Sequence, residues 1–88
     1  MMNKLEQEII NTIAEEGEID KSDITLDSNL YDLGIDSLSS LEILVALENK
    51  YDIRIAQNRL KNVNSVREII RVVSSELKKR QRKHNISD

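Results

Sequence analysis

Three segments of this 88-residue chain repeat aliphatic residues at intervals of three and four positions. Such spacing lays an apolar stripe along one face of an α-helix, whereas a half-buried strand alternates at every second residue. The stripes comprise Met2, Leu5, Ile9, Ile10 and Ile13; Leu38, Leu41, Leu44, Val45, Leu47 and Tyr51; and Val66, Ile69, Ile70, Val73 and Leu77. The sequence therefore predicts three main helices whose stripes face a common core.

Local signals predict where these helices begin and end. Gly17 is expected to end the first helix in a left-handed conformation. Ser65 and Glu68 have the spacing of a capping box at the start of the last helix. Residues 56–63 are long enough for a short extra helix that buries Leu60. We expect an all-α fold, a four-helix bundle of three main helices and one short helix with a long first loop.

The loop between the first two main helices runs from Gly17 to Asp36 and shows no clear period. A loop of this length is unusual in a compact domain unless it has a function. It contains six aliphatic side chains, namely Ile19, Ile24, Leu26, Leu30, Leu33 and Ile35. We therefore expect the loop to pack across the bundle, with Asp27-Ser28-Asn29 capping a single turn that stops at Gly34.

The composition excludes several classes of protein. Without cysteine there are no disulfides, no thiolate catalysis and no cysteine-ligated zinc. The single His84 offers neither a metal site nor a nucleophile–base pair, so we expect no catalytic residues. No apolar run approaches the length of a membrane span, and the start lacks a secretory signal. A monomer in the cytoplasm, without a membrane span, is the expectation.

Charge is distributed unevenly along the chain. Residues 1–60 carry a net charge of −8 and residues 61–88 a net charge of +5. An acidic body indicates partners with positive patches. We expect one domain over residues 1–77 and a basic, disordered tail over residues 78–88. Nucleic-acid binding through residues 78–83 is an alternative, but the chain lacks an aromatic platform for bases, so we expect no nucleic-acid partner.

The junction between the long loop and the second main helix carries the most informative residues. Asp36 and Ser37 stand where that helix is expected to begin. Either residue suits the N-cap position, where a side-chain oxygen accepts a hydrogen bond from a backbone amide. The hydroxyl of Ser37 would also project from the positive end of the helix dipole, where a phosphodiester is stabilised. The position of these residues in the sequence, taken alone, favours the interpretation as an N-cap over the interpretation as a phosphodiester site.

A longer pattern surrounds this junction. The run Leu33-Gly34-Ile35-Asp36-Ser37-Leu38, followed by Leu41-Glu42-Ile43 and Ala46-Leu47-Glu48, resembles the acyl carrier protein family. Asp27-Ser28-Asn29-Leu30, Tyr51-Asp52-Ile53 and Val63-Asn64-Ser65-Val66 fit the same family pattern. The resemblance covers roughly residues 3–77, so it is far more specific than an Asp-Ser pair.

This resemblance implies that Ser37 carries 4′-phosphopantetheine, installed from coenzyme A by a phosphopantetheinyl transferase. The thiol of that arm would hold an acyl group as a thioester. The resemblance also implies that Asp36 helps to position magnesium during transfer and that Leu38 is an apolar contact for partners. Glu42 and Glu48 would face basic docking patches on acyl-loading and acyl-using enzymes. The chain would then be a substrate of other enzymes and no enzyme itself.

An aliphatic core without phenylalanine is expected to part and admit an acyl chain. We place the acyl-chain pocket between the second main helix and the short helix, near Leu44, Val45, Ile53 and Leu60. Ordinary core packing is the alternative for each of these four residues.

Some positions depart from the family pattern. Ser39 and Ser40 follow the serine where carriers of fatty acid synthesis usually have more acid, and Arg59 and Lys61 lie where acids are common. These departures leave open which pathway the chain serves, whether fatty acid, lipid or polyketide-type biosynthesis. An aminoacyl or peptidyl carrier of a specialised pathway and a helical interaction module without an arm are the alternatives.

Overall fold

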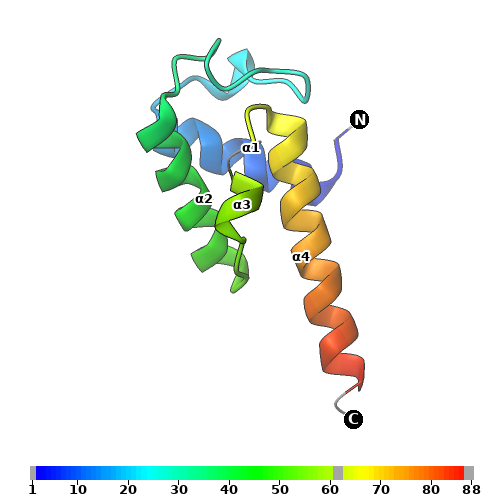
Figure 1. The fold of residues 1–88 in the computed structure, drawn as a ribbon. Helices are drawn as coiled ribbons and strands as arrows, with labels where there is room; N and C mark the ends of the chain where they lie inside the picture. Colours follow the sequence, from blue (N-terminus) through cyan, green and yellow to red (C-terminus); the bar gives the residue numbers. More distant parts are fainter. Residues whose placement is uncertain (1, 61–62, 87–88) are drawn as a thin grey trace.

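The computed structural model describes residues 2–60 and 63–86, except for the side chains of residues 57, 60 and 81–86. The described part contains the α-helices α1 (Lys4–Gly17), α2 (Ser37–Tyr51), α3 (Gln57–Leu60) and α4 (Val66–Ile86), and a short 3-10 helix, η1 (Lys21–Asp23). Figure 1 shows the long loop crossing one end of the molecule and α3 lying between α2 and α4. The predicted all-α bundle of three main helices and one short helix is confirmed.

The core is built from aliphatic side chains of all three main helices and of the long loop. Its fully buried members are Ile9, Ile13, Leu30, Ile35, Ile43, Leu47, Val66, Ile69 and Val73. Ile24 of the long loop is also buried, and Leu26 and Leu33 pack against the core. The loop therefore packs across the bundle as predicted, because its apolar side chains complete a core that three helices leave open.

A single turn organises the end of the long loop. The side-chain oxygen of Asn29 accepts hydrogen bonds from the amides of Tyr31 at 2.8 Å and Asp32 at 3.3 Å. Gly34 follows with a φ of 84°, a conformation that glycine adopts without the strain of a side chain. The predicted capped turn that stops at Gly34 is confirmed, and Asn29 supplies the cap.

Backbone hydrogen bonds fasten this loop to the start of α4. The amide of Leu30 donates to the carbonyl of Asn64 at 2.9 Å, and the amide of Val66 donates to the carbonyl of Ser28 at 3.0 Å. These bonds join segments that lie more than thirty residues apart in the sequence. The junction that precedes α2 is thus held in a fixed position relative to the bundle.

Two helix boundaries can be compared with their predicted caps. Gly17 is the last residue of α1, and the left-handed residue is Glu18, with a φ of 54°. The prediction of a left-handed Gly17 is therefore wrong. A Cβ at Gly17 would lie 3.1 Å from Cδ1 of Ile19, so glycine serves close packing at this position. At the start of α4, the hydroxyl of Ser65 accepts from the amide of Glu68 at 3.2 Å, which is one of the two hydrogen bonds of the predicted capping box.

Helix α4 continues to Ile86, beyond Leu77, where the sequence predicted a disordered tail. Residues 87–88 of that tail lie outside the described part, and the division into a domain over residues 1–77 and a tail over residues 78–88 stays a prediction. Charged contacts support the turn around Arg80. The guanidinium of Arg80 donates to the carbonyl of Tyr51 at 3.0 Å and lies 3.1 Å from a carboxylate oxygen of Asp52.

Candidate functional site

Asp36 and Ser37 divide two roles between them at the start of α2. Asp36 is the N-cap residue, and its Oδ1 accepts a hydrogen bond from the amide of Ser39 at 2.8 Å. Ser37 is the first helical residue, and its side chain is exposed. Within the described residues, the hydroxyl of Ser37 makes no hydrogen bond. Because the neighbouring aspartate provides the cap, this hydroxyl is available for chemistry.

The junction presents an ionised carboxylate and the start of a helix beside Ser37. The amide of Ser39, and secondarily its hydroxyl, hold the pKa of Asp36 below its ordinary value by stabilising the carboxylate. The start of α2 is also the positive end of the helix dipole, which attracts a phosphate. In the part of the chain described here, no three acidic or histidine side chains cluster to hold a metal. Asp36 therefore offers a single carboxylate beside the hydroxyl.

Replacement of Asp36 by asparagine is expected to reduce the acid sensitivity of the fold. Asparagine still caps a helix but does not titrate. Because folding lowers the pKa of Asp36, its ionised form stabilises the folded state above the ordinary value of 3.8, and this stabilisation is lost as the pH falls through the lower folded-state value. Urea unfolding at neutral and acidic pH should show a steeper acid loss in the wild type. Parallel pH profiles would contradict this expectation.

One face of α2 exposes apolar side chains, namely Leu38, Leu41 and Val45, which are 68%, 47% and 52% exposed. Their spacing of three and four residues places them in one row along the helix. We call this row the α2 apolar stripe. Isolated exposed apolar residues are common, but a contiguous row of them is typical of an interaction surface. The implied exposure of Leu38 agrees with the structure.

The predicted core-facing stripe included Leu38, Leu41 and Val45, and that prediction is wrong for all three. The buried residues of α2 are Ile43, Leu44 and Leu47. Apolar residues occupy most of the circumference of α2, so their periodicity did not specify which side meets α1. Ile43 in particular was missing from the predicted stripe.

The four residues expected at the acyl-chain pocket are not all brought together. Leu44 and Ile53 are buried, whereas Val45 points away from the core and is exposed. The expected place of Val45 beside an acyl chain is therefore wrong. The side chain of Leu60 lies outside the described residues.

The two glutamates expected to recognise partners occupy different surroundings. Glu42 is exposed and flanks the α2 apolar stripe, one turn from Leu38 and from Val45. Glu48 is half-buried, and its Oε2 accepts a hydrogen bond from the amide of Ile55 at 2.8 Å. Glu48 thus has a structural contact that the sequence did not reveal. Of these two glutamates, Glu42 is the exposed one beside the stripe.

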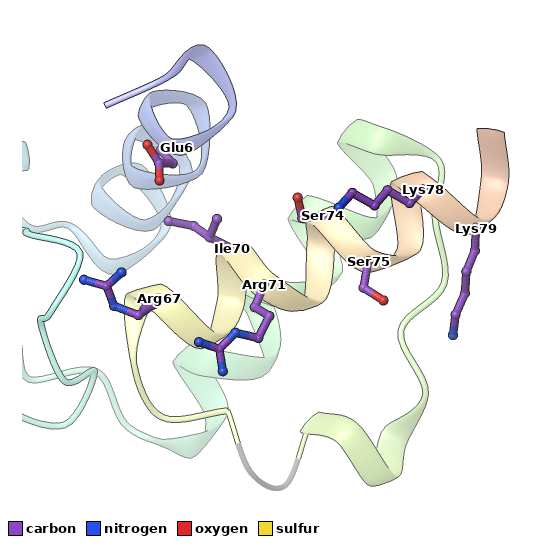
Figure 2. A pocket seen from close by; sticks show the side chains of 8 residues that line it. All are labelled: Glu6, Arg67, Ile70, Arg71, Ser74, Ser75, Lys78 and Lys79. Carbon is purple, nitrogen blue, oxygen red and sulfur yellow. The ribbon is translucent and has the colours of Figure 1, made fainter. Parts of the chain in front are cut away.

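A shallow groove follows α4, and Figure 2 shows the side chains that line it. They are Glu6 of α1 and Arg67, Ile70, Arg71, Ser74, Ser75, Lys78 and Lys79 of α4. Arg67 lies 2.7 Å from a carboxylate oxygen of Asp27, and Arg71 lies 3.2 Å from one of Glu68. These ion pairs neutralise part of the positive charge, and no residue of α2 reaches this groove.

Comparison with known proteins agrees with the geometry of the junction. The family described as "Phosphopantetheine attachment site" matches residues 7–73. An acyl carrier protein of Rickettsia massiliae (strain Mtu5) is 36% identical over 72 residues, which cover 81% of this chain and 84% of that protein. An acyl carrier protein of Rickettsia typhi (strain ATCC VR-144 / Wilmington) is 35% identical over the same shares.

Two similar solved structures come from Streptomyces coelicolor. The hexanoyl acyl carrier protein of the actinorhodin polyketide synthase superposes with a TM-score of 0.68 at 25% identity, over 90% of this chain and 92% of that one. The acetyl actinorhodin acyl carrier protein superposes with a TM-score of 0.69 at 27% identity, over 83% of this chain and 91% of that one.

The fold and the junction together define a phosphopantetheine-bearing carrier domain. The chain belongs to the acyl carrier protein family. The predicted family, fold and 4′-phosphopantetheine cofactor are thereby confirmed, and the role of the chain is that of a carrier. Within the described residues, no helix combines the length and apolarity needed to cross a membrane.

Proposed function

We propose that Ser37 is the attachment point of the 4′-phosphopantetheine arm and that the protein carries acyl thioesters in fatty acid, lipid or polyketide-type biosynthesis. The observation that carries this proposal is the exposed hydroxyl of Ser37 beside Asp36, which alone caps α2. When bound, the arm supplies a flexible thiol that holds the acyl group.

The chain's own residues prepare the transfer of the arm. The Oγ of Ser37 is the acceptor: it forms a bond to the phosphorus nearer the arm in the diphosphate of coenzyme A. The bond from that phosphorus to the bridging oxygen breaks, and the nucleotide leaves with the other phosphate. The hydroxyl proton passes to a base of the transferase. The carboxylate of Asp36, held ionised by Ser39, is suited to bind the magnesium ion that accompanies the phosphates. The positive end of α2 stabilises the phosphodiester that results.

The α2 apolar stripe and Glu42 are the surface that we propose for partner enzymes. Apolar contacts at Leu38, Leu41 and Val45 supply short-range complementarity. A negative charge at Glu42 attracts a basic rim and raises the rate of encounter without demanding a tight complex. A carrier that visits several enzymes in turn benefits from such rapid and reversible binding.

Ser39 and Ser40 are uncharged, whereas carriers of fatty acid synthesis usually have more acid at these positions. The surface next to the arm is therefore less negative here than in those carriers. Fewer acids leave the apolar stripe a larger share of the recognition. This supports a carrier with dedicated partners, because shape-dependent apolar contacts are less interchangeable between enzymes than long-range charge attraction.

Intact mass spectrometry tests the proposal. The full chain, treated with a broad-specificity phosphopantetheinyl transferase and coenzyme A, should gain the mass of one phosphopantetheine. With hexanoyl coenzyme A it should gain the arm together with the hexanoyl group. An unchanged mass beside a carrier that the same enzyme modifies would overturn the proposal.

Replacement of Glu42 by lysine is expected to slow encounter with partner enzymes, beginning with the transferase. Reversal of one rim charge should lower the association rate by about threefold to tenfold at low salt and less at high salt. Stopped-flow kinetics of modification measure the effect. Glu16→Lys is the matched control, because it makes the same charge change near the end of α1. Equal slowing in both variants would attribute the effect to net charge and not to this surface.

A further inference from the structure

The connection that follows α2 has loosely buried apolar side chains. We call residues 52–60, which include α3, the α3 segment. Its buried side chains Ile53 and Ile55 are 8% and 6% exposed, more than most of the core. Helix α3 has only four residues, and a helix of that length is unstable without external contacts. The position of this segment therefore depends on its neighbours.

Helix α4 holds the α3 segment near both of its ends through charged side chains. Oε2 of Glu76 lies 2.7 Å from Nη1 of Arg59, and the Glu76 side chain is only 16% exposed. Arg80 lies one turn further along α4, where it donates to the carbonyl of Tyr51 at 3.0 Å and pairs with Asp52 at 3.1 Å. Figure 1 shows α4 extending past α3 on this side of the molecule. Glu76 and Arg80 thus form one row that we call the α4 clamp.

A third polar contact joins the middle of the α3 segment to α2. The carboxylate of Glu48 accepts the hydrogen bond of the Ile55 amide at 2.8 Å. Displacement of the segment must therefore break an ion pair with α4 as well as this bond. Such contacts have a defined geometry and can break together in a local opening.

We propose that the α4 clamp determines how often the α3 segment leaves the core and so how readily the interior admits an acyl chain. Glu76 and Arg80 act as positioning residues, since they hold the segment that contains the buried side chains Ile53 and Ile55. This inference rests on the proposed function, because the acyl chain arrives on the arm of Ser37. Its physical basis is that the apparent affinity of a site scales with the fraction of time in which the site is open.

Amide hydrogen exchange of the unmodified chain tests the clamp itself. Glu76→Gln removes the charge that binds Arg59 and should speed exchange at the amides of Ile55 and Arg59 by roughly tenfold. Arg80→Gln, which breaks a more exposed pair, should speed it by about threefold. The Ser40 amide, which donates to Asp36 at 2.9 Å at the other end of α2, is the internal reference and should not change.

Two matched variants separate the clamp from a general loss of charge on α4. Glu68→Gln and Arg71→Gln remove the same charges from an exposed pair that does not touch the α3 segment. They should leave exchange at Ile55 and Arg59 unchanged. Wild-type exchange at these amides in both clamp variants, or equal acceleration in the control variants, would overturn the clamp. Acceleration at Ser40 as well would mean global destabilisation and would also overturn it.

A second experiment uses an acyl chain loaded on the arm to measure access to the interior of the bundle. The terminal methyl group of an octanoyl thioester, isotopically labelled and loaded on the arm, should show a nuclear Overhauser contact with Leu44. In Glu76→Gln the fraction of protein with this contact should rise in proportion to the open fraction, by up to about tenfold below saturation. An acetyl thioester, too short to reach the interior, is the control. An unchanged octanoyl contact in a chain with faster exchange would overturn the link between clamp and access.

The two proposals fail in different ways. Failure of the arm to attach to the wild type would overturn the proposed function, whereas hydrogen exchange of the unmodified chain does not depend on attachment. Normal attachment with no acceleration of exchange in Glu76→Gln would overturn the clamp and leave the carrier role standing.

Discussion

Replacement of Ser37 by alanine should abolish attachment of phosphopantetheine completely, while the free energy of unfolding changes by less than about 0.5 kcal/mol. The first effect is all or none because the arm requires an oxygen at this position. The second effect is small because Ser37 is exposed and Asp36 makes the capping hydrogen bond to Ser39. Intact mass after transferase treatment measures the first quantity, and urea denaturation measures the second.

Ser39→Ala and Ser40→Ala are the matched controls for this variant. Both serines lie in the first turn of α2, and both are half-buried, unlike Ser37. Each control should keep the mass gain of the wild type. A mass gain in Ser37→Ala would move the attachment point elsewhere. A decrease of more than about 2 kcal/mol in the free energy of unfolding of Ser37→Ala would show that the serine is mainly structural.

Replacement of Ile43 by alanine is expected to have a large effect on stability. Ile43 is fully buried, so its truncation should cost about 2–5 kcal/mol, through lost burial and the cavity left behind. A small domain has a total stability of only about 5–15 kcal/mol, so a large part of it would be lost. The free energy of unfolding in urea measures the effect.

Val45→Ala is the control on the opposite side of the same helix. Val45 is 52% exposed, and its truncation should cost less than about 1 kcal/mol. The pair therefore reports which face of α2 meets α1. Equal costs, or a larger cost at Val45, would contradict the orientation of α2 and support the core that the sequence had indicated.

Helix periodicity was sufficient to predict the three main helices, but it did not predict η1. The stripes of α1 and α4 have polar opposite faces, so their inner sides followed from spacing alone. Helix α2 is different because apolar residues occupy most of its circumference, from Leu38 and Leu41 through Ile43 to Leu47. A helix that is apolar on several sides has no unique inner face in its sequence. Only tertiary packing selects Ile43 over Val45.

The junction shows what local chemistry can and cannot predict. The sequence placed Asp36 and Ser37 at a helix start, which is confirmed, but both residues are able to cap, so the division of roles stayed open. Contacts between residues that lie far apart in the sequence could not be predicted from it. Arg59 and Glu76, for example, lie 17 residues apart on different helices, and nothing in the spacing of charges marks them as a pair.

The capping of α2 by Asp36 also bears on what happens when the serine is lost in a living cell. A chain without Ser37 would still fold, so chaperones and proteases would have no damage to detect and its abundance would stay normal. It would keep the α2 apolar stripe and Glu42, the surface that we propose for partner enzymes, and on that proposal it would continue to occupy those enzymes. Such an allele should inhibit the pathway even when an intact copy is present. The inhibition should increase with the fraction of the expressed protein that lacks the serine.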